Sequence, residues 1–140
     1  MSNHKFQCSS CAWSCESSPI ILECEKCSSP LNVRYLPQTS ANIQPTGWSG
    51  HTIPLPLDHQ EDLITLGEGS TPVVQLNNLK SRIMADIYVK QEYMNPTGSF
   101  KDRGTSIMIS ALKSMKVDEL VEDSSGNAGA SLSALSLIHI

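Results

Sequence analysis

The sequence has no long apolar run and no cluster of basic residues. None of its apolar stretches could cross a bilayer, and the first residues, MSNHKFQCSS, lack the apolar core of a secretory signal peptide. The net charge is -4, whereas a surface that binds nucleic acid needs clustered lysine and arginine. We therefore expect a cytoplasmic protein that binds neither nucleic acid nor membranes.

Cysteine is absent after residue 27, although the preceding part of the chain contains five cysteines. In a reducing compartment such crowding indicates metal ligation rather than disulfide bonds. Cys8 and Cys11 are separated by two residues, as are Cys24 and Cys27. Four thiolates with this spacing can close a tetrahedral site around zinc, and a site without an open position is structural. A module this small buries too little apolar surface to fold alone, so we expect zinc to be its core.

Cys15 is the fifth cysteine of this head. It follows Cys11 by four residues and could replace it in an alternative ligand set. The pair Cys24 and Cys27 is common to both sets, which makes it the firmer part of the prediction.

Three stretches of different composition predict the domain organisation. Residues 1–35 are the cysteine-rich, zinc-ribbon-like head, and residues 36–66 form a connector rich in proline and glycine, in which we expect little regular structure. Residues 67–140 carry a regular α/β pattern.

Strand and helix signals alternate in the third stretch. Residues 87–90 and 119–122 are short β-prone runs, residues 99–115 predict a helix, and a second helix is expected from about Ala130. This order predicts an α/β fold with a parallel sheet, in which the turns after both strands face one ligand crevice. The first helix has apolar residues that can share one face: Ile107, Met108, Ala111, Leu112 and Met115.

Lys101 stands just inside the first of these helices, after a tight turn that contains Pro96 and Gly98. Rigid backbone would anchor the lysine at its base while the amine reaches over the crevice. That placement suits Schiff-base chemistry, in which an unprotonated amine condenses with an aldehyde and later acts as general base and acid. From position alone, the alternative is a solvated surface lysine.

Three segments carry a resemblance to a known family. Residues 95–104, NPTGSFKDRG, resemble the lysine segment of fold-type II pyridoxal-phosphate enzymes, the tryptophan synthase β family, and most closely that of threonine synthases. Residues 66–72, LGEGSTP, and residues 124–131, SSGNAGAS, are similar to two further motifs of the family, in the same order. The resemblance implies a zinc ribbon followed by the first βαβα part of a fold-type II parallel sheet.

The resemblance also implies roles for individual residues. Lys101 would bind pyridoxal phosphate covalently, and Asn127 would donate a hydrogen bond to the 3'-oxygen of the cofactor. The loop around Asn127 would present backbone donors to the substrate carboxylate, a role that suits a helix N-terminus. The loop residues concerned are Ser125, Gly126, Asn127 and Ala128.

Residues beside the lysine receive weaker assignments. The hydroxyls of Thr97 and Ser99 would help to hold a substrate phosphate. Asp102 and Arg103 are interpreted as helix-start charges or an ion pair, without a chemical step of their own.

The reaction implied by the closest resemblance is that of threonine synthase, in which O-phosphohomoserine and water give threonine and phosphate. The parent enzyme would act on this small amino-acid substrate, as a homodimer. The ending SFKDRG favours this reaction over that of threonine and serine deaminases, which more often have SFKIRG. The alternatives are such a deaminase, a cysteate synthase, or a zinc-ribbon binding module.

The resemblance is incomplete, because family members extend over more than twice this length. A Gly-rich loop for the cofactor phosphate is not found in this sequence. The final residues, LSLIHI, resemble a translated sequencing-adapter remnant. We therefore expect an inactive N-terminal fragment of a longer enzyme.

Overall fold

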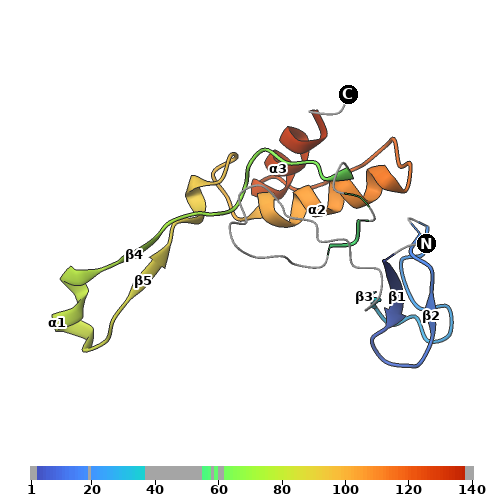
Figure 1. Ribbon diagram of the computed structural model, residues 1–140, viewed down its shortest axis with the longest axis horizontal. Coiled ribbons are helices and arrows are strands. Elements are labelled where there is room, and N and C mark those ends of the chain that lie inside the picture. The colour runs from blue at the N-terminus through green and yellow to red at the C-terminus, as the bar shows by residue number, and fades with distance from the viewer. Residues whose placement is uncertain (1–2, 19, 37–54, 58, 60–61, 138–140) are drawn as a thin grey trace.

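The computed structural model describes residues 3–18, 20–36, 55–57, 59 and 62–137. Figure 1 shows a small β-sheet head, a pair of packed helices and a projecting arm. Most of the predicted connector and the last three residues of LSLIHI lie outside the described ranges. None of the helices in those ranges has the length and apolar character needed to cross a bilayer.

The head is a three-stranded antiparallel sheet with the strand order β2-β1-β3. Its strands are β1 (His4–Cys8), β2 (Ser14–Cys15) and β3 (Leu31–Tyr35). In the register of β1 with β3, His4 is opposite Tyr35 and Cys8 is opposite Leu31. Few apolar side chains of these strands are buried, so the sheet alone supplies little hydrophobic stabilisation.

The arm is an antiparallel strand pair, β4 (Val73–Gln75) with β5 (Tyr88–Lys90), in which Val74 is opposite Val89. A short 3-10 helix, η2 (Asn77–Leu79), and α1 (Lys80–Ile83) join the two strands. The predicted strand at residues 87–90 is thus confirmed in position. Its partner β4 was not predicted.

The expected parallel pairing needs correction, although the mixed α/β composition is confirmed. Both sheets within the described residues are antiparallel. Residues 119–122 are extended but form no strand, and Val121 is 91% exposed. A strand requires the N–H and C=O groups of a neighbouring strand, and the described residues place none beside this segment.

Two helices form the body of the molecule: α2 (Lys101–Ser114) and α3 (Asn127–Leu137). They pack against each other, and the apolar contact between them consists of Ile109 and Leu135 together with Ile64 from the preceding loop. The first helix begins two residues later than predicted. The second begins at Asn127, three residues earlier than predicted.

The buried face of α2 is largely polar and differs from the predicted apolar face, since Met108 is exposed. The serine hydroxyls can be buried there because they find partners: Ser106 donates to the carbonyl of Arg103, and Ser110 donates to the carbonyl of Ser106 and accepts from the N–H of Ile64. Their small volume permits close approach of a neighbouring segment. The buried residues of the face are Asp102, Thr105, Ser106, Ile109 and Ser110.

Candidate active site and metal centre

Lys101 is the first residue of α2, and its side chain is exposed. The preceding turn is closed by a hydrogen bond of 2.8 Å from the N–H of Gly98 to the carbonyl of Asn95. Gly98 has φ +79°, a left-handed conformation in which other residues are strained. The Lys101 amine lies 5.0 Å from the centre of the Phe100 ring. The turn therefore presents one accessible amine at the positive end of a helix.

The hydroxyls that flank the lysine are engaged within the turn. Asp102 is fully buried, and its carboxylate accepts hydrogen bonds from both the N–H and the hydroxyl of Thr97. The hydroxyl oxygen of Ser99 accepts from the N–H of Lys101 at 3.1 Å. The substrate role of Thr97 and Ser99 stays a prediction, and these contacts give both residues a structural role as well.

The asparagine loop leads directly into α3. Ser125, Gly126 and Asn127 are exposed, whereas Ala128 is half-buried. The N–H of Gly126 donates to the Ser124 hydroxyl at 3.2 Å. Gly129 lies so close to the loop that a Cβ atom on it would be 2.8 Å from the Ser124 carbonyl oxygen. The absence of a side chain at Gly129 therefore shapes the loop.

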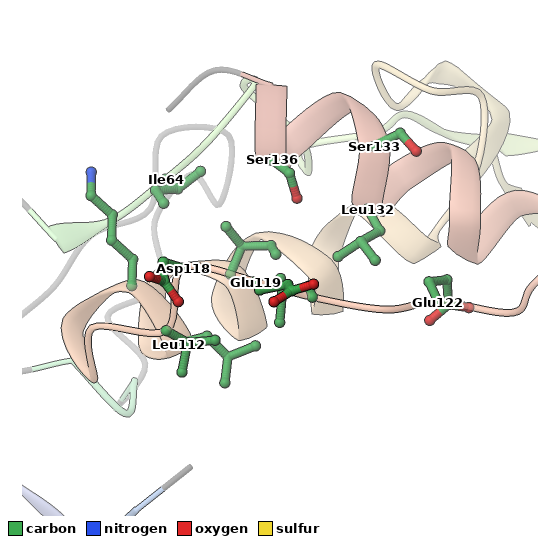
Figure 2. A pocket seen from close by; sticks show the side chains of 12 residues that line it. Ile64, Leu112, Asp118, Glu119, Glu122, Leu132, Ser133 and Ser136 are labelled. Atoms are coloured by element: carbon green, nitrogen blue, oxygen red, sulfur yellow. The ribbon is translucent and has the colours of Figure 1, made fainter. Parts of the chain in front are cut away.

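The lysine turn and the asparagine loop begin neighbouring helices. Figures 1 and 2 show the chain after α2 running back along it, so that α2 and α3 begin at the same end of the pair. The fold thus brings Lys101 and Asn127, the first residues of α2 and α3, to the same end of the helix pair. Within residues 62–137, no hydrogen bond joins these two side chains.

A cavity of about 820 Å³ lies farther along the helices, between α2, α3 and residues 117–122 (Figure 2). Ile64, Ile109 and Leu132 contribute apolar surface to it, and Asp118, Glu119 and Glu122 contribute carboxylates. Its lining on α2 begins two turns after Lys101, so this cavity is separate from the lysine turn.

Sequence reasoning missed Glu92, which lies in the short 3-10 helix η3 (Glu92–Met94) and pairs with Arg103 at 2.8 Å. Hydrogen bonds from Arg103, then from Thr71 and Asn95, lower the pKa of Glu92 from 4.5 to about 2. The same pairing raises the pKa of Arg103. The ion-pair interpretation of Arg103 is thereby confirmed. The sequence feature that could have identified Glu92 is its position at the start of the polar segment that contains the lysine.

The head brings four cysteines together, and its geometry fits a tetrahedral metal. The sulfur atoms of Cys8, Cys11, Cys24 and Cys27 all lie within 4.8 Å of one another. Cys8 and Cys27 are 3.5 Å apart, Cys11 and Cys24 are 3.7 Å apart, and Cys11 and Cys27 are 3.8 Å apart. Thiolates about 2.3 Å from a tetrahedral zinc ion would lie about 3.8 Å from one another. Cys15 is outside this cluster, so the structure favours the first of the two ligand sets.

The environment of the cluster favours the thiolate at Cys27 and opposes it at Cys11. The backbone N–H groups of Ser10 and Cys11 both donate to the Cys8 sulfur at 3.3 Å. Hydrogen bonds with Ser29, and then with Cys8 and Cys24, lower the pKa of Cys27 to about 6. A Trp13 backbone hydrogen bond lowers the pKa of Cys11, but the Cys8 thiol, burial and the other two thiols raise it to about 12. Without a bound cation, the thiols of Cys27 and Cys11 therefore lose their protons at very different pH values.

The chain resembles known proteins at the level of family. Residues 64–138 match the family described as "Pyridoxal-phosphate dependent enzyme". Threonine synthase of Methanocaldococcus jannaschii is 40% identical over 83 residues, which cover 59% of this chain and 20% of that protein. Threonine synthase of Methanosarcina acetivorans is 30% identical over 138 residues, which cover 92% of this chain and 33% of that protein.

A second kind of relative is also similar. Cysteine synthase of Staphylococcus aureus strain N315 is 48% identical over 75 residues, which cover 51% of this chain and 24% of that protein. The chain thus spans between a fifth and a third of the length of these curated relatives. No solved structure gave a significant match. Because the family match includes the lysine turn and the asparagine loop, and covers more than half of the chain, the chain belongs to the pyridoxal-phosphate dependent enzyme family.

Proposed function

We propose that this chain supplies the lysine-bearing part of a threonine synthase-like enzyme, which converts O-phosphohomoserine and water to threonine and phosphate in the cytoplasm. The observation that carries the proposal is Lys101, an exposed amine at the start of α2, within the segment that matches the family. The similarity to threonine synthases supports the choice of substrate.

The family's cofactor, pyridoxal phosphate, supplies an electron sink for carbanion chemistry when bound. The Lys101 amine would bond covalently to it and, once released, would move protons at the substrate carbons. Asn127, at the start of α3, would donate to the 3'-oxygen of the cofactor. Phosphate leaves the γ carbon of the substrate, and water adds its hydroxyl to the β carbon while the γ carbon ends as a methyl group, so the atoms balance.

The start of α3 would bind the substrate carboxylate. Ser125 and Gly126 are exposed, and the first N–H groups of a helix have no acceptors within it. The helix dipole adds about 0.3 to 1 kcal/mol for an exposed anion at this position. Backbone donors of Ser125, Gly126 and Ala128 would therefore bind the carboxylate, for which the Gly126 N–H would exchange its present bond to the Ser124 hydroxyl. The hydroxyls of Thr97 and Ser99 would contact the substrate phosphate.

Reductive trapping of the full 140-residue chain tests the assignment of the lysine. The chain is incubated with pyridoxal phosphate and reduced with borohydride, and the modified peptides are mapped by mass spectrometry. We expect the adduct on Lys101, its loss in Lys101→Arg and its retention in the control Lys113→Arg, since Lys113 is an exposed residue near the end of α2. Equal modification of the other exposed lysines would refute the assignment.

Cysteine synthase activity is a second candidate, favoured by the 48% identity to the Staphylococcus aureus protein. The two candidates differ in the leaving group that is displaced from the substrate. A gene product that contains the remainder of the enzyme, assayed with O-phosphohomoserine and with an O-activated serine, distinguishes them. Phosphate release from the former supports the first candidate, and sulfide incorporation into the latter supports the second.

We also propose that Cys8, Cys11, Cys24 and Cys27 bind a structural zinc ion. The sulfur separations support this proposal, because they match the edges of a zinc–thiolate tetrahedron. Such a site would stabilise the head, whose strands bury little apolar surface.

A further inference from the structure

The Glu92 carboxylate joins η3 to the first turn of α2. Arg103 donates to it twice, from Nε to Oε2 at 2.8 Å and from Nη2 to Oε1 at 2.9 Å. This fork-on-fork geometry fixes the direction of approach as well as the distance. Both side chains are about three-quarters buried, with 26% and 24% exposure, so solvent screens the pair only in part.

Two further segments converge on the same carboxylate. The hydroxyl of Thr71 donates to Glu92 Oε1 at 2.6 Å, and Asn95 Nδ2 donates to Oε2 at 3.1 Å. Asn95 in turn accepts from the N–H of Gly69 at 3.0 Å. Arg103 also donates to the Thr71 hydroxyl oxygen at 3.2 Å. Residues 69–71, 92–95 and 103 are therefore held together around Glu92.

A second carboxylate acts on Arg103. Glu68 is 1% exposed; its Oε2 accepts from the Thr65 hydroxyl and from the N–H of Leu66, both at 2.9 Å. Glu68 Oε1 is buried and has no hydrogen-bond partner within the described residues. The negative charge of Glu68 favours the charged form of Arg103. Lys90 Nζ lies 4.0 Å from Glu92 Oε1. The negative charges of Glu68 and Glu92 are thus balanced by the positive charges of Lys90 and Arg103.

The cluster brackets Lys101 in the sequence. Asn95 lies at the start of the preceding turn, and Arg103 lies two residues after the lysine in the first turn of α2. Asp102, between Lys101 and Arg103, is bonded back to Thr97. Hydrogen bonds therefore hold the backbone on both sides of the lysine, whose own side chain is exposed.

We infer that Glu92 is a positioning residue, which through Arg103, Thr71 and Asn95 fixes the Lys101 turn against residues 69–71 and so sets where the amine lies. The inference rests on the proposed function, which gives that amine an aldehyde to capture. Glu92 acts through the backbone and contacts neither cofactor nor substrate.

The test measures the modification of Lys101 relative to that of Lys113 in the same molecule, which serves as an internal reference. The full chain and its variants are labelled with pyridoxal phosphate and borohydride across a pH series, and the ratio is read by mass spectrometry. We expect Glu92→Gln and Arg103→Lys to lower the ratio about tenfold and to shift its pH profile, since small misplacements of reacting groups cost large factors in rate. The matched controls, Glu122→Gln and Arg82→Lys, change exposed residues outside the cluster and should leave the ratio unchanged.

Two conservative substitutions of Thr71 distinguish a loss of positioning from a loss of folding. Thr71→Val keeps the volume but removes the hydroxyl, and Thr71→Ser keeps the hydroxyl. We expect Thr71→Val to lower the ratio and Thr71→Ser to retain it, with unchanged helical circular dichroism in both. Equal ratios in the wild type, Glu92→Gln and Thr71→Val would overturn the inference.

A second label separates this inference from the proposed function. Reductive methylation with formaldehyde needs an accessible amine but no cofactor site. If the wild type shows no preference for Lys101 with pyridoxal phosphate, the proposed function fails. The formaldehyde ratio then decides the inference: a changed ratio in Glu92→Gln and Arg103→Lys supports positioning by Glu92, and an unchanged ratio contradicts it.

Discussion

The side-chain amide of Asn3 donates to the main-chain carbonyl of Leu57, more than fifty residues away in the sequence. The same amide donates to the carbonyl of Leu55 at 3.1 Å. Leu55 and Leu57 are buried and pack against Ile107 and Ala111 of α2. One asparagine at the edge of the head therefore attaches the cysteine module to the helical body.

The tautomer of the adjacent histidine follows from this arrangement. Asn3 uses its NH2 group for Leu55 and Leu57, so its Oδ1 faces His4 Nδ1, 2.8 Å away, as an acceptor. Nδ1 of His4 must then carry the proton. Asn3 thus holds three residues in place: Leu55, Leu57 and His4.

Replacement of Asn3 by alanine should loosen the head from the body. Two buried carbonyls would lose a donor, and a buried unsatisfied group costs about 1 to 3 kcal/mol. Urea unfolding followed by circular dichroism measures the change in the free energy of unfolding. Asn32→Ala is the matched control, because Asn32 is an exposed asparagine on β3. Similar losses in both variants would contradict the attachment role of Asn3.

Removal of zinc should unfold the head while α2 and α3 remain helical. We expect one zinc ion per chain, released by a chelator, and loss of binding in Cys24→Ser but retention in Cys15→Ser, since Cys15 lies outside the cluster. Atomic absorption gives the stoichiometry. A chain that folds its head equally well in the presence of excess chelator would argue against a structural metal.

Zinc affinity should rise with pH, because binding displaces thiol protons. Cys27, with a pKa near 6, is ready to bind at neutral pH, whereas Cys11, with a pKa near 12, must lose its proton to the metal. Below about pH 6 the Cys27 thiolate also becomes protonated, so affinity should fall more steeply there. A competition titration with a chromophoric chelator measures how zinc affinity changes with pH. It is carried out from about pH 5 to about pH 8, below the ordinary pKa of a cysteine thiol. A flat profile would exclude thiolate ligation.

Gly129→Ala should destabilise the chain, because its Cβ would lie 2.8 Å from the Ser124 carbonyl oxygen. The clash is with backbone, so the asparagine loop must shift. Gly104→Ala is the control within α2, where a Cβ meets nothing within 4 Å. There alanine should stabilise the helix by about 0.5 to 1 kcal/mol. Thermal unfolding of both variants should show changes of opposite sign.

Stability should fall in acid as Glu92 becomes protonated. Its pKa in the folded chain is about 2, below the ordinary 4.5, so the ion pair contributes fully above about pH 4.5 and the contribution is lost as pH falls toward 2. The contribution is on the order of 2 kcal/mol, allowing for solvent screening of a carboxylate that is 26% exposed. Urea unfolding from pH 7 to pH 3 should show this decline in the wild type and a shallower one in Glu92→Gln. Parallel curves for the two proteins would show that protonation of Glu92 does not cause the loss of stability.

Features that depend on local spacing were predictable from the order of the residues alone. Paired cysteines at fixed intervals predicted the head, because ligand spacing is short-range, and the structure gathers the four predicted sulfur atoms. The segment around Lys101 predicted a turn followed by a helix, because Gly98 and Pro96 restrict the backbone locally. The family resemblance, which the matched residues 64–138 confirm, depended on the same contiguous segments.

Which segments lie against one another depends on the three-dimensional fold and could not be read from the order of the residues. The partner of the strand at residues 88–90 is β4, fifteen residues earlier, and the run at residues 119–122 has no partner among the described residues, so it is not a strand. The polar buried face of α2 and the convergence on Glu92 likewise depend on distant residues. A polar or apolar side chain finds its partners among the residues that the fold places beside it. Periodicity along the chain does not show which distant residues these will be.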